Sequence, residues 1–308
     1  MGLIFNDACM LWEAKLRGAS FRTTLTIAHL SLCLHPSEVR LFQKAYRRKH
    51  PTSSLDALEG YQWGEYSDRF LHTFLDVDAL EILDNSAYER ATLIHDLNLP
   101  VPESLHARFD AVIDAGTLEH VFNFPVALAN LMKMVRLGGS IFITTAANNL
   151  CGHGFYQFSP EVFFRAFTKE NGFNLLRVVF LERRFPIVEL VPVRRAYSVK
   201  DPAAIRERVG LLSNRPVSMM VEAIKTAHSA PFVAFPQQSD YMAVWDQATR
   251  SDHMPQAKRR GLRAVRSHAF RKLPSFLQNW TIGHCCAQMY SFANRSFYQR
   301  YKERDPQV

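Results

Sequence analysis

Three short apolar runs in the middle of the chain, each with an acidic residue at or next to its end, most constrain the possible fold. They are ALEILD (79–84), ATLIHD (91–96) and FDAVIDA (109–115). Apolar runs this continuous are typical of parallel strands that are buried on both faces of a sheet. We therefore expect three strands of one sheet, with acidic side chains near their carboxyl ends.

Helical and strand-like segments alternate around these runs. Strand-like segments alternating with helical ones predict a doubly wound, mostly parallel, Rossmann-like α/β sheet. The stretch 195–236 interrupts this alternation and is expected to be an insertion. The expected strands are 23–30, 140–146, 173–182 and DYMAVW (240–245), and the expected helices are 6–18, 63–74, 124–136 and one that opens at Ser159.

Positive charge is concentrated at the end of the sequence. The chain has a net charge of +8, and eleven basic but only two acidic residues lie from Pro255 onward. We expect an α/β domain over 1–250 and a basic, helical extension over 251–308. The segment 257–304 can contact an anionic membrane surface or nucleic-acid phosphates, or it can form helices whose arginines face water. We favour the last interpretation and do not expect nucleic acid as a partner.

Several classes of protein are not expected from the sequence. No apolar stretch reaches the roughly 20 residues that a membrane-spanning helix needs, and no targeting segment precedes the first helix. The five cysteines form no Cys-x-x-Cys pair and the twelve histidines form no His-Glu-x-x-His motif, so we expect neither disulfides nor a metal site. A cytoplasmic location is the simplest expectation.

Two of the strand-end acids have the right chemistry for binding a nucleoside. Asp84 can accept hydrogen bonds from both hydroxyls of a ribose, or it can simply cap the following turn. Asp96 can accept from the amino group of an adenine while Leu97 packs on the ring, or it can belong to a turn before Pro100. Both alternatives stay open for each acid.

The segment FDAVIDAGTLEHV (109–121) carries the strongest functional signal. Gly116 permits a sharp turn at the end of the strand, because glycine adopts positive φ at little cost. Glu119 and His120 follow this turn. His120 is either a general base or a packed histidine that bonds to a backbone carbonyl.

A second polar and aromatic segment, AANNLCGHGFYQF (146–158), follows the strand at 140–146. His153 lies between two glycines and can act as a base or hold an acceptor hydroxyl, with Asn149 and Tyr156 nearby. The alternative is a rigid loop whose polar side chains bond to their own backbone.

The order of these features resembles the central block of class I S-adenosylmethionine-dependent methyltransferases. The resemblance is carried by FDAVIDAGTLEHVFNFPVALANLMKMVRLGGSIFITT and covers roughly residues 20–180. Within that family, AANNLCGHGFYQFSPEVFFRAF and QQSDYMAVW are similar to segments of uncharacterised bacterial methyltransferase-like proteins. The resemblance implies S-adenosylmethionine as cofactor. It also implies catalytic roles for His120 and His153, acceptor contacts from Glu119, Asn149 and Tyr156, and cofactor contacts from Ala28, Asp84, Asp96, Leu97, Asp114, Ala115, Gly116 and Thr117.

One segment departs from the family pattern. Class I methyltransferases usually carry a glycine-rich turn after the first strand, whereas LTIAHLSLCLHPSE (25–38) contains no glycine. Two functions therefore remain: methylation of a small polar or sugar-like acceptor, at oxygen, or a binding or scaffold role on a catalytically degenerate fold. A nicotinamide enzyme is not expected, because Gly-x-Gly-x-x-Gly is absent.

Overall fold

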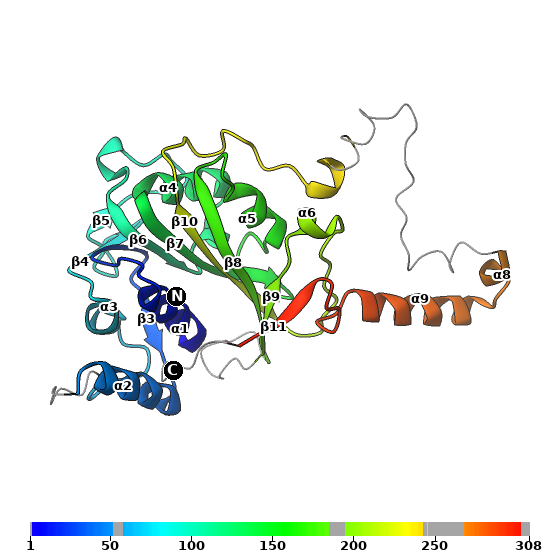
Figure 1. The fold of residues 1–308 in the computed structure, drawn as a ribbon, viewed down its shortest axis with the longest axis horizontal. Coiled ribbons are helices and arrows are strands. Elements are labelled where there is room, and N and C mark those ends of the chain that lie inside the picture. Colours follow the sequence, from blue (N-terminus) through cyan, green and yellow to red (C-terminus); the bar gives the residue numbers. More distant parts are fainter. Residues whose placement is uncertain (1, 52–57, 185–194, 243–244, 246–267, 303–308) are drawn as a thin grey trace. The chain divides into compact units, whose positions relative to one another are not determined.

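The computed structural model describes residues 2–51, 58–184, 195–242, 245 and 268–302, and a nine-stranded sheet is its largest feature (Figure 1). The strands follow the order β11-β9-β8-β10-β7-β6-β2-β4-β5 across the sheet. Their bounds are β2 (Thr23–Ile27), β4 (Ala79–Asp84), β5 (Leu93–Ile94), β6 (Phe109–Ala115), β7 (Val135–Asn148), β8 (Phe173–Glu182), β9 (Arg195–Val199), β10 (Val217–Lys225) and β11 (Tyr298–Tyr301).

Five strands, β5, β4, β2, β6 and β7, form a parallel block in which each strand is parallel to its neighbours. Counted along the chain, they lie in the order 3-2-1-4-5, as do the corresponding strands of the doubly wound fold. Beyond this block, β10 is antiparallel to both β7 and β8. The predicted doubly wound, mostly parallel sheet is therefore confirmed.

Helices cover both faces of this sheet. Ala111 and Ile113 of β6 belong to one buried cluster with residues of α1 and α3, including Phe74. On the other side, α4 contacts β6 and β7, and its buried Leu128 lies outside that cluster. Side chains alternate between the faces of a strand, which is why β6, buried along its whole length, can fill both layers. The helices are α1 (Phe5–Leu16), α2 (Pro36–Lys49), α3 (Asp68–Leu75), α4 (Phe124–Met134), α5 (Pro160–Ala166) and α6 (Pro202–Ile205).

The connection from β2 to β4 is long and carries its own small sheet. Strand β3 (Ser31–Cys33) pairs in parallel with β1 (Gly2–Ile4), and α2 and α3 follow. The helix predicted over 63–74 begins only at Asp68. Residues before it are held against β3 instead, since Tyr66 bridges Ser31 and Gly64 adopts a φ of +85°.

The stretch 195–236 is not simply an insertion, because β10 lies within it and occupies the centre of the sheet. Two charged residues interrupt its sequence VSMMVEAIK and hide the strand from a search for apolar runs. Lys225 Nζ donates to the carbonyl oxygens of Met132 (2.7 Å) and Val135 (3.0 Å) at the end of α4, and burial lowers the pKa of this ammonium group.

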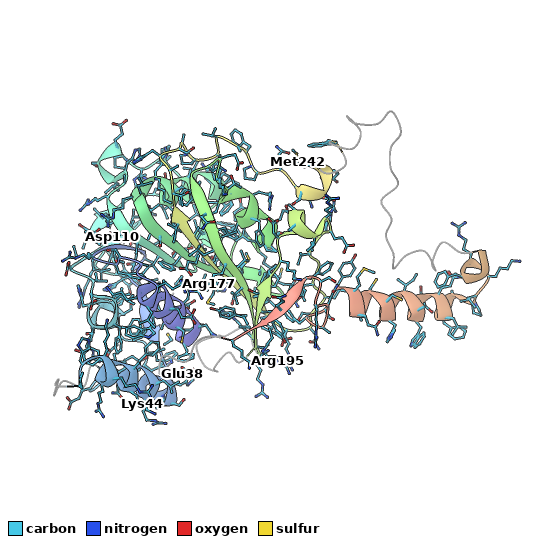
Figure 2. The ribbon with its side chains drawn as sticks, in the orientation of Figure 1. Glu38, Lys44, Asp110, Arg177, Arg195 and Met242 are labelled. Carbon is cyan, nitrogen blue, oxygen red and sulfur yellow. The ribbon has the colours of Figure 1, made fainter. Side chains whose placement is uncertain are left out.

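Glu222, the other charged residue of β10, is neutralised by a buried ionic network. Its carboxylate lies 2.5 Å from Arg177 of β8 and 2.5 Å from Arg17, the residue directly after α1. Arg177 also reaches Glu13 of α1, at 2.6 Å, and the hydroxyl of Tyr301 (Figure 2). Burial alone lowers the pKa of the Arg177 guanidinium, but Glu222, Tyr301 and Glu13 together raise it above its ordinary value. The network keeps these charges paired inside the sheet layer.

The prediction of a late strand at 240–245 is wrong, since residues 239–242 are helical. The strands of this sheet that follow β9 along the chain are β10 and β11, which lie before and after the expected strand. In the extension expected over 251–308, the described residues form α8 (His268–Arg271), α9 (Ser275–Met289) and β11. Five of its basic residues, from Lys258 to Arg266, lie outside the described residues, as does the expected boundary at residue 250.

Two compact units make up the chain. The first comprises Met1–Ser198, Arg215–Pro236 and Arg300–Val308, and the second comprises Val199–Asn214 and Gln237–Gln299. The parallel block and every residue of the predicted site belong to the first unit. Among the described residues, no helix combines the length and apolar character that crossing a membrane requires.

Candidate functional site

The carboxyl ends of β2 and β6 mark the position where this sheet is expected to bind ligands. The two strands are parallel neighbours, and the chain leaves them toward opposite edges of the sheet, to β4 and to β7. In open α/β sheets, ligands bind outside such a switch point. Thr117 joins the two strand ends, since its hydroxyl donates to the Ile27 carbonyl at 3.3 Å.

Asp84 and Asp96 lie at the ends of the neighbouring strands β4 and β5, and both are partly exposed. Asp84 Oδ1 accepts from the Ser86 N–H at 3.2 Å, and Asp96 Oδ1 accepts two hydrogen bonds from Asn98. The bonds from Asn98 hold the pKa of Asp96 below its ordinary value. Each acid thus caps its own turn with one oxygen and keeps a second oxygen for another donor. Leu97, in contrast, is buried.

The end of β2 is crowded. Ala28 adopts a φ of +66°, a left-handed conformation that glycine takes without strain, and its N–H donates to the Leu83 carbonyl at 2.8 Å. The ring of His29 is buried and stacks on Tyr66 with a centroid separation of 3.4 Å. Its two nitrogens lie 2.9 Å from Asp68 Oδ1 and 2.7 Å from the Glu89 carbonyl oxygen. His29 therefore links the start of α3 to the loop after β4.

Asp114 supports the turn after β6. Its carboxyl accepts from the N–H groups of Thr117 (2.8 Å) and Leu118 (3.4 Å), and only 1% of the residue is exposed. Burial raises the pKa of Asp114 to about 8, and the nearby Glu119 acts in the same direction. Gly116, with a φ of +104°, allows the chain to bend here. Ala115 is buried beside it.

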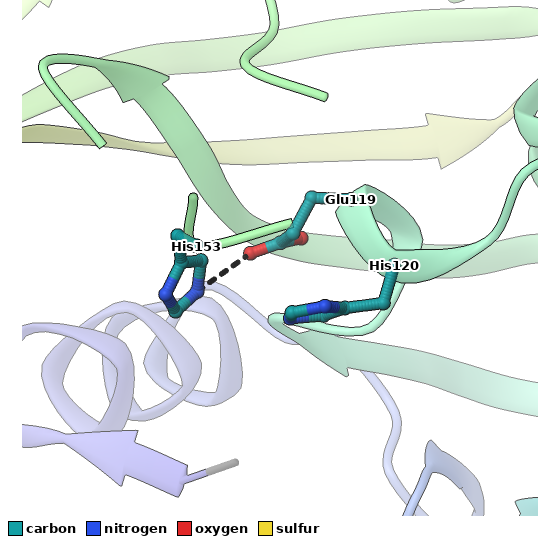
Figure 3. Close-up of side chains that lie close together, drawn as sticks. All are labelled: Glu119, His120 and His153. Atoms are coloured by element: carbon teal, nitrogen blue, oxygen red, sulfur yellow. Dashed lines mark ion pairs between the residues drawn. The ribbon is translucent and has the colours of Figure 1, made fainter. Parts of the chain in front are cut away.

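Glu119, His120 and His153 come together at this end of the sheet (Figure 3). Glu119 and His120 lie in the 3-10 turn η2 (Leu118–His120), and His153 lies in the loop after β7. Glu119 is 1% exposed, and its Oε2 accepts from the Thr145 hydroxyl at 2.7 Å. His153 Nε2 lies 3.4 Å from Glu119 Oε1, and the rings of His120 and His153 are 5.2 Å apart. Both histidines are exposed.

The loop that carries His153 is fixed to the backbone of Glu119. The N–H groups of Phe155 and Tyr156 donate to the Glu119 carbonyl at 2.8 and 3.2 Å. A Cβ atom at Gly154 would lie 2.7 Å from the same oxygen, so only glycine fits there without a backbone shift. This close approach brings together Glu119 and Gly154, which are 35 positions apart in the sequence.

Two of the predicted acceptor-binding residues satisfy backbone groups. The Tyr156 hydroxyl donates to the Phe122 carbonyl at 2.7 Å, and Asn149 Nδ2 donates to the Arg215 carbonyl at 3.0 Å. Both bonds tie the loop to other segments, the turn after β6 and the residues before β10, and neither goes to the backbone of the loop itself. Glu119 is buried, and its side chain lies next to His153.

Sequence reasoning missed an exposed aromatic pair next to the histidines. Phe122 is 72% exposed and Phe155 is 68% exposed, and their rings meet edge to face at 6.0 Å. In the sequence, each resembles an ordinary core residue. The only available signal was the density of aromatic residues around His153.

The residues at the ends of β4, β5 and β6 fit S-adenosylmethionine. Asp84 and Asp96 each present a carboxylate oxygen, a group able to accept from a ribose hydroxyl or an adenine amino group, and Gly116 leaves the end of β6 without a side chain. The backbone of Ala28 has the conformation of the missing glycine, although its Cβ and the ring of His29 narrow this side.

Comparisons with known proteins are limited to structures. No protein-family model matches the sequence, and no curated protein matches it. A SAM-dependent methyltransferase from Thermotoga maritima is 12% identical, with a TM-score of 0.39, and the match covers 72% of this chain and 90% of that one. A protein from Bacillus halodurans assigned as a methyltransferase is 11% identical, with a TM-score of 0.36 and coverages of 72% and 99%.

A third similar structure is a variant of a 16S rRNA (adenine(1408)-N(1))-methyltransferase from Catenulisporales acidiphilia. It is 11% identical, with a TM-score of 0.31, and the match covers 72% of this chain and 94% of that one. TM-scores and identities this low carry no conclusion about an acceptor. The assignment of the fold therefore rests on the strand order and directions of the sheet itself.

Proposed function

We propose that this protein is an S-adenosylmethionine-dependent methyltransferase that acts on a hydroxyl of a small polar or sugar-like acceptor. Two sets of residues on either side of the switch point support the proposal. Asp84 and Asp96 lie on the β4–β5 side, and the cluster of Glu119, His120 and His153 lies at the end of β6. The first set suits a nucleoside and the second suits an acceptor.

The pairing of His153 with a buried carboxylate is the observation that supports methylation of an acceptor oxygen. Glu119 Oε1 lies 3.4 Å from His153 Nε2, and the Thr145 hydroxyl holds the other oxygen. A carboxylate behind an imidazole fixes its orientation and stabilises its protonated form. Such an imidazole is suited to remove the proton that a hydroxyl must lose when it becomes a nucleophile.

The remaining residues bind and orient. Asp84 would accept from the ribose hydroxyls and Asp96 from the adenine amino group, while the bend at Gly116 lets the backbone approach the cofactor. When bound, S-adenosylmethionine supplies a methyl group activated by its sulfonium. Phe122 and Phe155 would pack against the apolar face of a sugar ring and hold the acceptor near His153.

Calorimetry with S-adenosylmethionine tests the cofactor site. We expect a Kd on the order of 10 µM, within the range typical of enzyme ligands. Asp84→Ala and Asp96→Ala should each weaken binding by at least about tenfold, because a hydrogen bond to a charged group contributes about 1.5–3 kcal/mol. Asp78→Asn is the matched control, since Asp78 precedes β4 and pairs with Arg22. Equal affinities in all four proteins would contradict the proposed site.

Methyl transfer from radiolabelled cofactor to a panel of polyols, sugars and amines tests the acceptor. His153→Ala and Glu119→Gln should lose transfer to hydroxyl acceptors while they retain cofactor binding. Transfer to amines but not to hydroxyls would overturn the choice of oxygen.

A catalytically degenerate binding protein is the second candidate, and the packing of His29 favours it. The His29 ring, bonded to Asp68 and Glu89, fills space at the end of β2 where a glycine-rich turn would leave room. If the folded protein does not bind millimolar cofactor, this candidate is supported. Restoration of binding by Ala28→Gly combined with His29→Gly would then identify these side chains as the obstruction.

A further inference from the structure

Three potential metal ligands converge at the surface of the first unit. One ligand atom each from Glu119, His120 and His153 lies within 4.8 Å of the other two (Figure 3). Two imidazoles and one carboxylate form a ligand set that binds Zn²⁺ and related divalent transition-metal ions. The sequence predicted no metal site because these residues form no His-Glu-x-x-His motif.

The spacing of two of these atoms suits a shared metal ion better than a direct hydrogen bond. His153 Nε2 and Glu119 Oε1 are 3.4 Å apart, whereas N–H···O hydrogen bonds span about 2.7–3.2 Å. Two ligands of one tetrahedral Zn²⁺, each about 2.0–2.1 Å from the ion, lie about 3.3 Å apart. The exposed His120 ring supplies the third ligand atom, within 4.8 Å of the other two.

The carboxylate is held as metal-binding carboxylates usually are. Glu119 is 1% exposed, and Thr145 donates a 2.7 Å hydrogen bond to Oε2, which leaves Oε1 directed at His153. Hydrogen bonds of this kind orient ligands and are part of most metal sites. The Gly154 approach and the bonds from Phe155 and Tyr156 to the Glu119 carbonyl fix the position of the His153 loop.

We propose that Glu119, His120 and His153 bind one divalent transition-metal ion of the Zn²⁺ class. Three protein ligands leave at least one coordination position for water or for an acceptor hydroxyl. A hydroxyl bound to such an ion loses its proton near neutral pH. With the ion bound, the metal would therefore activate the acceptor in place of His153, and His153 would act as a ligand instead of as a base. The ligand assignment stands on the geometry alone, and only its catalytic use rests on the proposed function.

Metal titration of the full chain, after treatment with a chelator and without cofactor, tests the ligand assignment. We expect one Co²⁺ per chain by visible absorption and one Zn²⁺ by calorimetry. Glu119→Gln, His120→Ala and His153→Ala should each weaken binding by at least about tenfold. Circular dichroism and urea unfolding verify that each variant is folded, and Glu119→Gln keeps an acceptor for Thr145.

Two control variants separate this site from other surface ligands. His106→Ala removes an exposed histidine after η1 (Glu103–Leu105), and Cys151→Ser removes an exposed thiol two residues before His153. Both should bind metal as the unchanged protein does. The proposal is overturned if the folded, unchanged protein shows no saturable binding. It is also overturned if the three ligand variants retain full affinity, or if Cys151→Ser abolishes it.

Cofactor binding measured on the chelator-treated protein keeps the two proposals distinguishable. Metal binding without any cofactor binding would leave the metal site standing and reject the methyltransferase. Cofactor binding and methyl transfer by a protein that shows no saturable metal binding would reject the metal site and leave the methyltransferase standing.

Discussion

Gly154 illustrates how one residue without a side chain can determine the geometry of a site. It allows the loop after β7 to lie against the carbonyl of Glu119, and this contact positions His153 beside the buried carboxylate. Neither histidine is placed by a regular helix or strand. The arrangement of the cluster therefore depends on backbone packing at this single point.

Gly154→Ala should destabilise the protein by about 1–3 kcal/mol, the usual cost of adding a methyl group to a packed position. The new Cβ would lie 2.7 Å from the backbone oxygen of Glu119, which cannot rotate away. Gly283→Ala in α9 is the control, because no atom lies within 4 Å of its Cβ. Urea unfolding should show a loss only for Gly154→Ala, and equal stabilities would contradict the close approach.

At the scale of elements, buried charges connect α1 to the sheet at two places. One is the network of Arg177 with Glu13 of α1 and Glu222 of β10. The other is Asp7 near the start of α1, which accepts from the Thr144 hydroxyl of β7 at 2.7 Å and from the Ile4 N–H at 3.0 Å. Both contacts fix the helix to strands of the central sheet.

Arg177→Met should lower the free energy of unfolding by about 3–5 kcal/mol, because it removes the central cation from two buried carboxylates. Glu222 would keep only Arg17, and Glu13 only the Tyr301 hydroxyl and the more distant Arg17. Arg195→Met is the matched control in the same sheet, since Arg195 is half-exposed where it pairs with Glu182 (Figure 2). An exposed pair contributes at most about 1 kcal/mol. Similar urea midpoints for the two variants would show that the network contributes little.

The stability of the protein should fall as the pH rises above 3.8, the ordinary pKa of aspartate, because burial raises the pKa of Asp7 in the folded state. Between the two pKa values, the folded chain binds a proton that the unfolded chain releases, so unfolding becomes easier with rising pH. Each pH unit in that window costs up to about 1.4 kcal/mol.

Urea midpoints measured from pH 4 to pH 8 check this pH dependence. Asp7→Asn should remove part of the decline, because asparagine does not titrate and still accepts one hydrogen bond. Asp78→Asn, at an exposed position, should leave the decline unchanged. The interpretation fails if both variants follow the same curve as the unchanged protein.

At the scale of the molecule, α1 of the first unit and α9 of the second differ in how many of their residues are buried. In the first unit, nine of the twelve residues of α1 are buried. In the second unit, no residue of the fifteen-residue α9 is buried, and Phe276 and Trp280 are each 68% exposed. Helices in proteins gain most of their stability from tertiary packing.

Hydrogen exchange should therefore separate the two helices. Amides of α9 should exchange much faster than those of α1 and β6, because a helix without buried side chains opens at little cost. Mass spectrometry of the full chain, with peptides covering 5–16, 109–115 and 275–289, measures the difference. Equal protection of α9 and α1 would show that α9 packs against a partner in solution.

The partners of the whole molecule stay predictions. A small or sugar-like acceptor, contact of 257–304 with an anionic surface, the absence of nucleic acid and a cytoplasmic location are each untested by the structure. Retention on heparin that falls steeply with salt, together with protection of RNA, would indicate that nucleic acid is a binding partner.

Local sequence determined the strands and most helices. The runs 79–84, 109–115 and 173–182 coincide with β4, β6 and β8. Of these, β6 is buried along its whole length, and a strand buried on both faces needs a continuous apolar run that is readable in any window of the chain. The same reasoning located Asp84, Asp96 and Gly116 at strand ends. β10 escaped it, since Glu222 and Lys225 become compatible with burial only through Arg177, Arg17 and the carbonyls of α4.

Only the tertiary structure decided which side chains form the site. The Asp114 carboxyl accepts a hydrogen bond within the turn that follows β6, and the His29 ring, just after β2, stacks on Tyr66. His153 was brought to Glu119 from 34 residues away. These outcomes depend on distances between segments that are remote in sequence, and no periodicity or local propensity encodes such distances. The order of strands in the sheet sets them, and that order exists only once the chain has folded.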